Sequence, residues 1–206
     1  MKLYTTARAP NPRRVEIFLA EKGITDLERV EIDLAGHVHF GADHQARNPF
    51  ARVPVLELPD GRYLSESRAI CTWLEAQHPE PNLMGVDAVE RAFIEEADRR
   101  AEYFLLIPIA MAVRHQHPGL AVLEQPQFPE YGRSQAAKLA EYLARFDELL
   151  GRQPWLAGER YTIADITAWC ALEFGRGLLK LKPADLGYAN LAAWRERMAA
   201  RPAVAG

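Results

Sequence analysis

The sequence predicts an α/β domain followed by an all-helical domain. Three observations carry this prediction: strand and helix patterns alternate in the first part of the chain, a proline-rich polar segment follows at 78–82, and strand patterns are almost absent after it. Mixed elements followed by a run of helices indicate two domains rather than one sheet with helices on both faces. We therefore expect domains at 1–80 and 88–206.

The chain is expected to begin with a β-α-β unit. Short strands are predicted at 2–5 and 27–33, and a helix at 11–22 lies between them. Apolar residues of that helix recur at the i, i+3, i+4 spacing of a buried face, and Gly23 stands where a helix-ending glycine belongs. A strand-helix-strand connection predicts a right-handed crossover between two parallel strands.

A hairpin and a helix should complete the first domain. Apolar runs at 53–58 and 62–64 flank the turn sequence Pro-Asp-Gly at 59–61, which is typical of two antiparallel strands. A helix is then predicted at 66–77.

The second domain is expected to be helical throughout. Helical periodicity runs over 88–114, 134–150, 163–180 and 191–200. Thr162 and Asp165 have the spacing of a capping box, in which each side chain satisfies a backbone group at the start of a helix. This pair predicts a helix start and a role in folding rather than in chemistry.

Composition excludes several classes of protein. Basic residues do not gather into a run, and the net charge is −3, which speaks against a nucleic-acid partner. No stretch reaches the roughly 20 apolar residues that a membrane span needs. The two cysteines, Cys71 and Cys170, lie in apolar helical patterns and predict buried thiols rather than a disulfide framework. We expect a cytoplasmic protein.

Three parts of the chain resemble the glutathione transferase superfamily. Residues 48–56 and 64–70 are similar to its NPxxxVPxL…LxESxAI signature, residues 158–166 to its helix-capping motif, and residues 2–24 to its opening. The resemblance implies a thioredoxin-like domain that binds glutathione and a helical-bundle domain that binds a hydrophobic electrophile. It also implies a homodimer, and no metal.

The resemblance assigns most of the glutathione contacts to the signature. Pro54 would be cis, so that the backbone of Val53 pairs with the peptide like an added strand; a plain edge strand with a trans proline is the alternative. Ser67 and Glu66 would receive the γ-glutamyl end at a helix N-terminus, although Ser65 or Ser67 could simply cap that helix.

Two further residues are candidates for contacts with glutathione. Arg52 could form a bidentate pair with the glycine carboxylate. His39 falls where some members carry a histidine, and a solvated loop histidine is its alternative. His37, His44 and His78 are interpreted as solvated loop residues.

The chain departs from the family where the thiol is activated. Ala9 stands where related members carry a serine, which leaves Asn11, Thr6, backbone N–H groups and His115 as substitutes. Asn11 followed by proline also has the pattern of a helix cap. His115 precedes a Pro-Gly-Leu turn, as in an atypical fungal-type group, but the serine that accompanies it there is Ala121 here. Both His115 and His117 could instead cap a helix C-terminus.

The leading hypothesis is conjugation of the glutathione thiolate to a hydrophobic electrophile. Glutathione-dependent disulfide or peroxide reduction, and a binding module that never activates the thiol, are the alternatives. Residues that could line the electrophile pocket, or simply form core, are Tyr103, Phe104, Leu105, Ile107 and Met111. The helix beginning near Ala88 has the mixed surface that suits a two-fold dimer interface.

Overall fold

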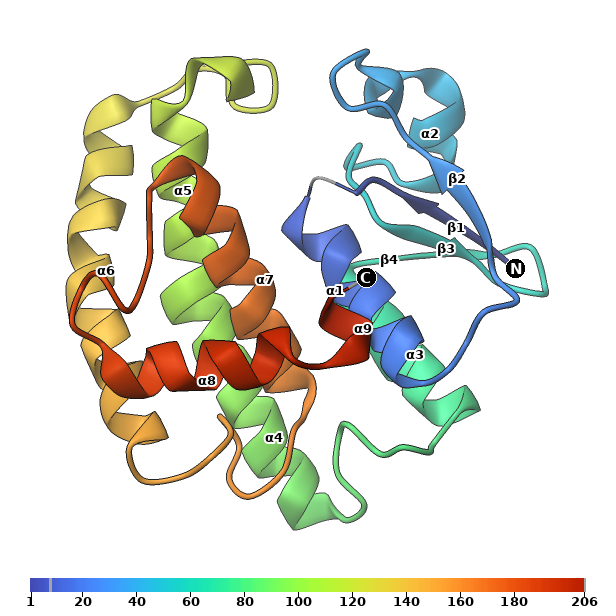
Figure 1. Ribbon diagram of the computed structural model, residues 1–206. Coiled ribbons are helices and arrows are strands. Elements are labelled where there is room, and N and C mark those ends of the chain that lie inside the picture. Colours follow the sequence, from blue (N-terminus) through green and yellow to red (C-terminus); the bar gives the residue numbers. More distant parts are fainter. Residues whose placement is uncertain (8, 206) are drawn as a thin grey trace. The chain divides into compact units, whose positions relative to one another are not determined.

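The computed structural model describes residues 1–7 and 9–205, and the chain divides into two compact units, Met1–Asn82 and Leu83–Gly206. The first unit combines a four-stranded sheet with helices, and the second is helical (Figure 1). The predicted fold class, α/β followed by all-α, is confirmed. Among the described residues, no helix has the length and apolar character to cross a membrane.

The sheet of the first unit has the strand order β2-β1-β3-β4. Its strands are β1 (Lys2–Thr5), β2 (Glu28–Glu31), β3 (Val55–Glu57) and β4 (Tyr63–Ser65). As predicted, β1 and β2 are parallel and β3 and β4 form an antiparallel hairpin, which joins the sheet through antiparallel pairing of β3 with β1. Helices α1 (Pro10–Glu21) and α3 (Ser67–Gln77) pack against each other (Figure 1).

The ends of α1 are set by local sequence. The helix starts with Pro10, a residue already restricted to helical φ, and the cap position is Ala9. Gly23 follows the helix with φ of 66°, a conformation that glycine adopts without a steric penalty. Lys22, the C-cap residue of α1, is buried: its Nζ lies 2.5 Å from Glu75 Oε2 and donates to the carbonyl of Pro81 at 2.6 Å.

The connection between β2 and β3 contains two short helices that the sequence pattern did not predict. These are η1 (Val38–Phe40) and α2 (Ala42–Arg47). Helices this short have too few turns to produce a recognisable hydrophobic period. They matter because they bring two histidines, His39 and His44, into the interior.

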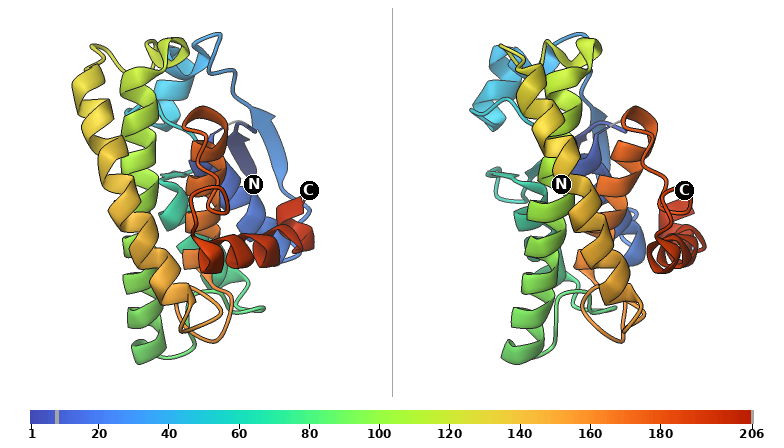
Figure 2. Two further views of the ribbon diagram at one scale, coloured as in Figure 1. Left: turned by 60° about the vertical axis from the view of Figure 1, so that its left-hand side comes forward. Right: turned by 90° about the vertical axis from the view of Figure 1, so that its left-hand side faces the viewer.

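One long helical rod opens the second unit (Figure 2). It consists of α4 (Ala88–Ala101), a π-helical turn η2 (Glu102–Leu106) and α5 (Ile107–Gln116). Within η2 the N–H of Ile107 donates to the carbonyl of Glu102, five residues back. The next residue, Pro108, has no N–H to continue an α-helical ladder, which accounts for the wider turn at this place.

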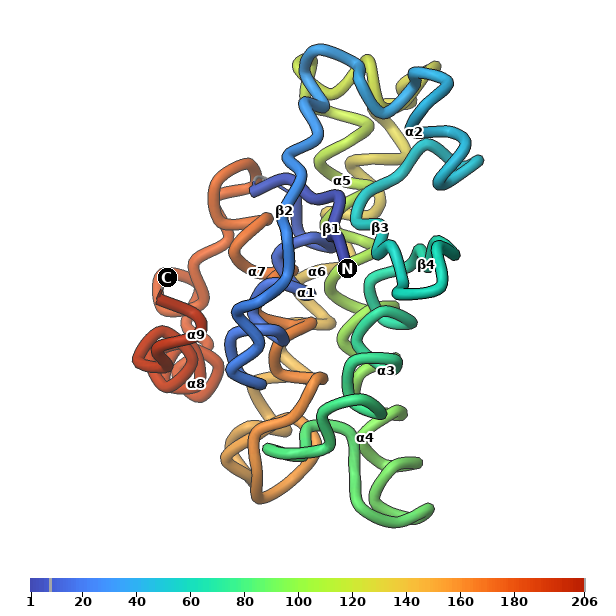
Figure 3. The backbone as a smooth tube through the Cα atoms, turned by 90° about the vertical axis from the view of Figure 1, so that its right-hand side faces the viewer, coloured from blue at the N-terminus to red at the C-terminus, as the bar shows by residue number. Residues whose placement is uncertain are grey.

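Helix α7 (Ile163–Leu178) forms the core of the second unit. Residues 163–172 are all buried, and α7 packs against α4, η2, α5 and α8 (Ala189–Ala199). Helix α6 (Pro129–Leu150) packs along α5 and α8, the turn η3 (Pro118–Leu120) follows α5, and α8 leads into the short α9 (Pro202–Ala205) near the C-terminus (Figure 3).

The capping box at the start of α7 is present as predicted. Asp165 is fully buried and accepts hydrogen bonds from the backbone N–H groups of Thr162 and Leu156, each at 3.0 Å. It also accepts from the Nε1–H of Trp194 at 2.9 Å and from the hydroxyl of Thr162 at 3.3 Å. Burial raises the pKa of this carboxyl to about 6, and the hydrogen bonds oppose that shift.

Candidate functional site

The segment before β3 presents unpaired backbone to the surroundings. The peptide bond between Val53 and Pro54 is cis, as expected from the resemblance. Val53 lies just outside the paired strand, which begins at Val55. Within residues 1–7 and 9–205, its N–H and C=O have no backbone partner, so they are available to an extended peptide.

Two side chains hold this segment in place from α2 and the residue that follows it. The carbonyl of Arg52 accepts from the Nδ2–H of Asn48 at 3.0 Å and contacts His44 Nε2 at the same distance. Ala51, between them, has a positive φ of 52°. The interpretation of His44 as a solvated loop residue is therefore wrong: the side chain is buried and positions the backbone next to Val53.

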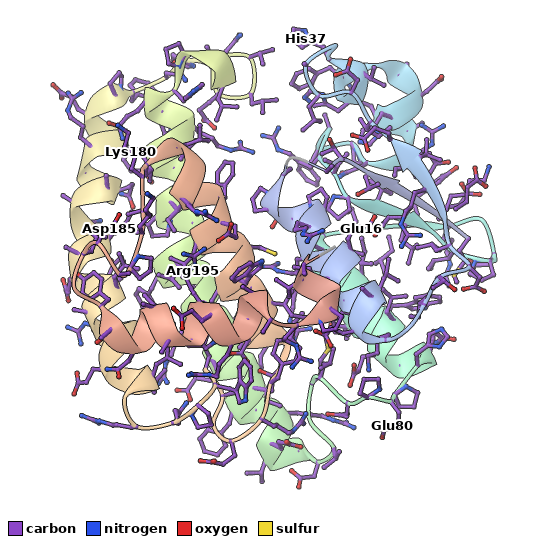
Figure 4. All side chains as sticks on the ribbon, viewed as in Figure 1. Glu16, His37, Glu80, Lys180, Asp185 and Arg195 are labelled. Carbon is purple, nitrogen blue, oxygen red and sulfur yellow. The ribbon has the colours of Figure 1, made fainter. Side chains whose placement is uncertain are left out.

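His39 lies in the interior beside a cationic group. Only 1% of the residue is exposed, and neither ring nitrogen has a hydrogen-bond partner in the described part of the chain. Burial lowers the pKa of His39, and the charge of Arg52 lowers it further. The solvated-loop alternative for His39 is wrong. His37, at the loop tip before η1, is exposed as expected (Figure 4), and so is His78.

The start of α3 carries the other end of the signature. Its cap position is Glu66, which has φ of 67° and ψ of 111° and makes no side-chain capping hydrogen bond. A non-glycine residue in this conformation is strained, and such residues cluster at ligand sites. Neither Ser65 nor Ser67 is the cap, because Ser65 ends β4 and Ser67 is the first residue of the helix. The capping alternative for the serines is wrong.

Ser67 has a partner that sequence analysis missed. Its Oγ is buried and accepts a hydrogen bond from Nη1 of Arg14 at 2.9 Å. Arg14 is 1% exposed, although arginine is rarely buried. The signal in the sequence was its place on the apolar face of α1, at i−3 and i−4 from Ile17 and Phe18.

The resemblance places the thiol of glutathione near the start of α1. Asn11 is exposed in the first turn, and because the cap is Ala9, the interpretation of Asn11 as a helix cap is wrong. The amide of Asn11 makes no hydrogen bond to another described residue. Thr6 is buried and donates its hydroxyl to Glu31 Oε1 at 2.8 Å. The Thr6 proton is thus already engaged within the sheet.

In the second unit, His115 is buried at the end of α5. Its Nδ1 accepts from the N–H of Phe128 at 3.1 Å, so the neutral ring carries its proton on Nε2, which lies 3.8 Å from Glu124 Oε1. His117 accepts from the N–H of Gly119 at the start of η3. His117 is the C-cap residue of α5, in agreement with the capping alternative, and its backbone N–H donates to the carbonyl of Val113. His115 lies in the last turn of α5, but its ring accepts from Phe128 and does not cap a helix carbonyl. Gln127 donates to the carbonyls of Arg114 and His117.

The residues expected to line an electrophile pocket do not share one surface. Leu105 is fully buried in the core, whereas Tyr103 and Ile107 are exposed. Phe104 turns toward α6, where its ring meets that of Tyr142 in an edge-to-face contact at 5.1 Å between centroids. Met111 is half-buried on α5. Burial excludes only Leu105: Phe104 is partly exposed and lines a pocket between this segment and α6, and Tyr103, Ile107 and Met111 are also accessible.

The comparisons with known proteins agree with the fold and identify the family. Residues 9–77 match the family described as glutathione S-transferase, N-terminal domain, and residues 110–202 match its C-terminal domain. Glutathione S-transferase 2 of Saccharomyces cerevisiae is 36% identical and aligns over 99% of this chain and 88% of its own length. The fold and the signature therefore define a glutathione transferase architecture.

Two solved structures show the same architecture over nearly the whole chain. A glutathione S-transferase domain-containing protein of Marinobacter aquaeolei VT8 is 40% identical with a TM-score of 0.93, covering 99% of this chain and 100% of that one. Gtt2 of Saccharomyces cerevisiae is 35% identical with a TM-score of 0.93, covering 100% and 99%. The chain belongs to the glutathione S-transferase family.

Proposed function

We propose that this protein transfers glutathione to a hydrophobic electrophile, acting as a cytoplasmic homodimer. The observation that supports this most strongly is in the first unit. There the backbone N–H and C=O of Val53, and buried side-chain nitrogens of His39 and Arg14 outside the signature, have no partner among the described residues, and a short anionic peptide would satisfy such groups. The exposed apolar side chains of Val89 and Phe93 on α4 supply surface for the second copy.

The peptide would be held at three places. Val53 pairs with the cysteinyl backbone through its free N–H and C=O. Arg52 and His39 face the glycine carboxylate, where a ligand would give the buried imidazole the hydrogen-bond partner that it lacks. Ser67 and the first N–H groups of α3 receive the γ-glutamyl carboxylate, and Glu66 attracts its ammonium.

Thiol activation is the demanding step. Lowering a thiol pKa from about 8.5 to about 6.5 requires roughly 2.7 kcal/mol of preferential thiolate stabilisation. A helix N-terminus supplies about 0.3–1 kcal/mol when exposed and up to roughly 2 when partly buried. The N-terminus of α1 therefore needs help from at least one side-chain donor.

Two donors are proposed for that role. Asn11 is the first, since its amide is exposed in the first turn of α1 and is not used as a cap. His115 is the second, since its Nδ1 is occupied as an acceptor and its proton is therefore on Nε2. Acting directly or through a water molecule, either N–H would stabilise negative charge on sulfur.

Titration of the bound glutathione thiol by ultraviolet absorbance tests this function. We expect the bound thiol to ionise well below its free pKa, and turnover of 1-chloro-2,4-dinitrobenzene to follow the same ionisation. His115→Ala should raise the thiol pKa and lower turnover with little change in glutathione affinity if Nε2–H is the donor. A bound thiol that ionises normally would overturn the transferase proposal in favour of a reductase or a binding module.

A further inference from the structure

Arg14 is a buried cation without a paired carboxylate among the residues that the structure describes. The residue is 1% exposed, and within that part of the chain it makes one hydrogen bond, from Nη1 to Ser67 Oγ. Its Nε and Nη2 are buried and have no acceptor among residues 1–7 and 9–205, and no carboxylate of those residues pairs with it. Buried charges are normally paired, so this guanidinium lacks a negative partner that something else must supply.

The single hydrogen bond of Arg14 also determines what Ser67 can do. Arginine only donates hydrogen bonds, so Ser67 Oγ must be the acceptor in this contact. The serine proton is therefore left for a different acceptor. Ser67 is the first residue of α3, where backbone N–H groups have no acceptor within the helix and the helix dipole favours an anion.

We propose that Arg14 is a positioning residue for the carboxylate of the γ-glutamyl end of glutathione, and that it acts through Ser67. The inference rests on the proposed glutathione site and deepens it. The carboxylate accepts the Ser67 proton, Ser67 accepts from Arg14, and the ligand provides the negative charge that the guanidinium lacks. No bond other than hydrogen bonds forms or breaks.

In this arrangement the guanidinium of Arg14 lowers the stability of the ligand-free protein and raises its affinity for the ligand. Without ligand, the buried cation opposes folding, because desolvation of the guanidinium is not compensated by an anion. With ligand, the same cation strengthens the hydrogen bond that Ser67 gives. An apolar substitute of similar length should therefore make the ligand-free protein more stable and make glutathione binding weaker. A side chain that serves the fold alone would not produce this pair of changes.

The first arm of the experiment uses Arg14→Met and Arg14→Lys in the full chain. Arg14→Met should raise the ligand-free melting temperature by about 2 °C or more and weaken glutathione binding about tenfold or more, measured by calorimetry. Arg14→Lys should recover part of the affinity because it restores the charge. Arg29→Met is the matched control: Arg29 Nε pairs with Glu16 Oε2 at 2.9 Å on the surface, and its loss should change neither quantity.

The second arm changes the ligand. The peptide 4-aminobutanoyl-Cys-Gly keeps the amine of glutathione and lacks the γ-glutamyl carboxylate. The wild type should prefer glutathione over this analogue about tenfold or more, whereas Arg14→Met and Ser67→Ala should show little preference. Combining the two substitutions should remove no further preference.

The outcomes separate the two proposals. If the wild type binds neither peptide, the proposed function fails and the role of Arg14 fails with it. If the wild type prefers glutathione and Arg14→Met keeps that preference, Arg14 is structural and the proposed function stands. If Arg14→Met does not fold, Arg14→Lys and Ser67→Ala still decide: an undiminished preference in both overturns the inference.

Discussion

Two buried charged groups, one in each unit, have opposite surroundings. Asp165 in the helical unit accepts hydrogen bonds from Thr162, Leu156 and Trp194. Arg14 in the α/β unit is buried to nearly the same degree and donates one hydrogen bond, to Ser67. The buried carboxylate of Asp165 has its hydrogen-bond partners inside the chain and therefore serves the fold. The unpaired charge of Arg14 is the one that we propose to serve ligand binding.

Other residues of the α/β unit support the same distinction. His39 is buried without a hydrogen-bond partner in the described residues, and Glu66 and Ala51 hold positive φ angles that only glycine adopts without penalty. Each feature costs free energy in the ligand-free protein, and all belong to the glutathione signature or the loop before it. Strain and unpaired groups at one site indicate selection for binding rather than for stability.

The largest expected effect on stability is that of replacing Asp165, whose carboxylate is fully hydrogen-bonded inside the helical unit. Asp165→Ala should lower the free energy of unfolding by about 3 kcal/mol or more, because it leaves several buried donors without an acceptor. Glutathione affinity of the folded fraction should not change. Denaturant unfolding and calorimetry measure the two quantities.

Asp147→Ala is the matched control for Asp165→Ala. Asp147 also accepts a backbone N–H at a helix start, from Leu191 at 2.8 Å, but it is only partly buried. Its loss should cost about 1 kcal/mol or less. Equal losses of unfolding free energy in Asp165→Ala and Asp147→Ala would show that burial does not determine the cost of removing the carboxylate. That result would contradict the distinction drawn for Asp165.

A smaller effect of opposite sign is expected at Glu66. Glu66→Gly should be more stable without ligand than Glu66→Ala by about 1 kcal/mol, because glycine adopts the observed φ of 67° freely. Both variants should bind glutathione more weakly to the same extent, because both lack the carboxylate. Thermal unfolding and calorimetry distinguish the two effects. A glycine variant no more stable than the alanine variant would mean that Glu66 stores no strain.

The smallest effect is expected at Asn11. Asn11→Ala should change the free energy of unfolding by less than about 0.5 kcal/mol, since Ala9 is the cap and Asn11 is exposed. The same substitution should raise the pKa of the bound glutathione thiol. A stability loss near 1 kcal/mol, measured in denaturant, would restore a capping role and weaken the case for Asn11 as a thiolate donor.

Much of the fold was predictable because it depends on local sequence patterns: hydrophobic period, turn residues and helix caps. The helix that ends before Gly23 and the capping box of Thr162 and Asp165 depend on residues close in sequence. The cis bond at Pro54 followed from resemblance and not from any local preference. The α/β order and the helical second half followed from hydrophobic period.

The interior of the site was not predictable in this way. The residues next to His39 in the sequence do not predict its burial, and the place of Arg14 on an apolar helix face does not predict its partner, because both depend on packing between elements far apart along the chain. The contact from Arg14 to Ser67 spans two helices, and His39 is buried by a loop with little periodicity. The cap position of α1 was misplaced by two residues, since both Pro10 and Pro12 suit a helix start.

The hydrogen bonds of the Lys22 ammonium determine where an isolated α/β fragment of this protein must end. It pairs with Glu75 and donates to the carbonyl of Pro81, so the proline-rich segment is bonded to the α/β unit rather than only trailing from it. A fragment ending at Gln77 would keep the buried ammonium and lose a carbonyl that solvates it. An excised glutathione-binding fragment must therefore extend through Pro81, beyond the last residue of its last helix.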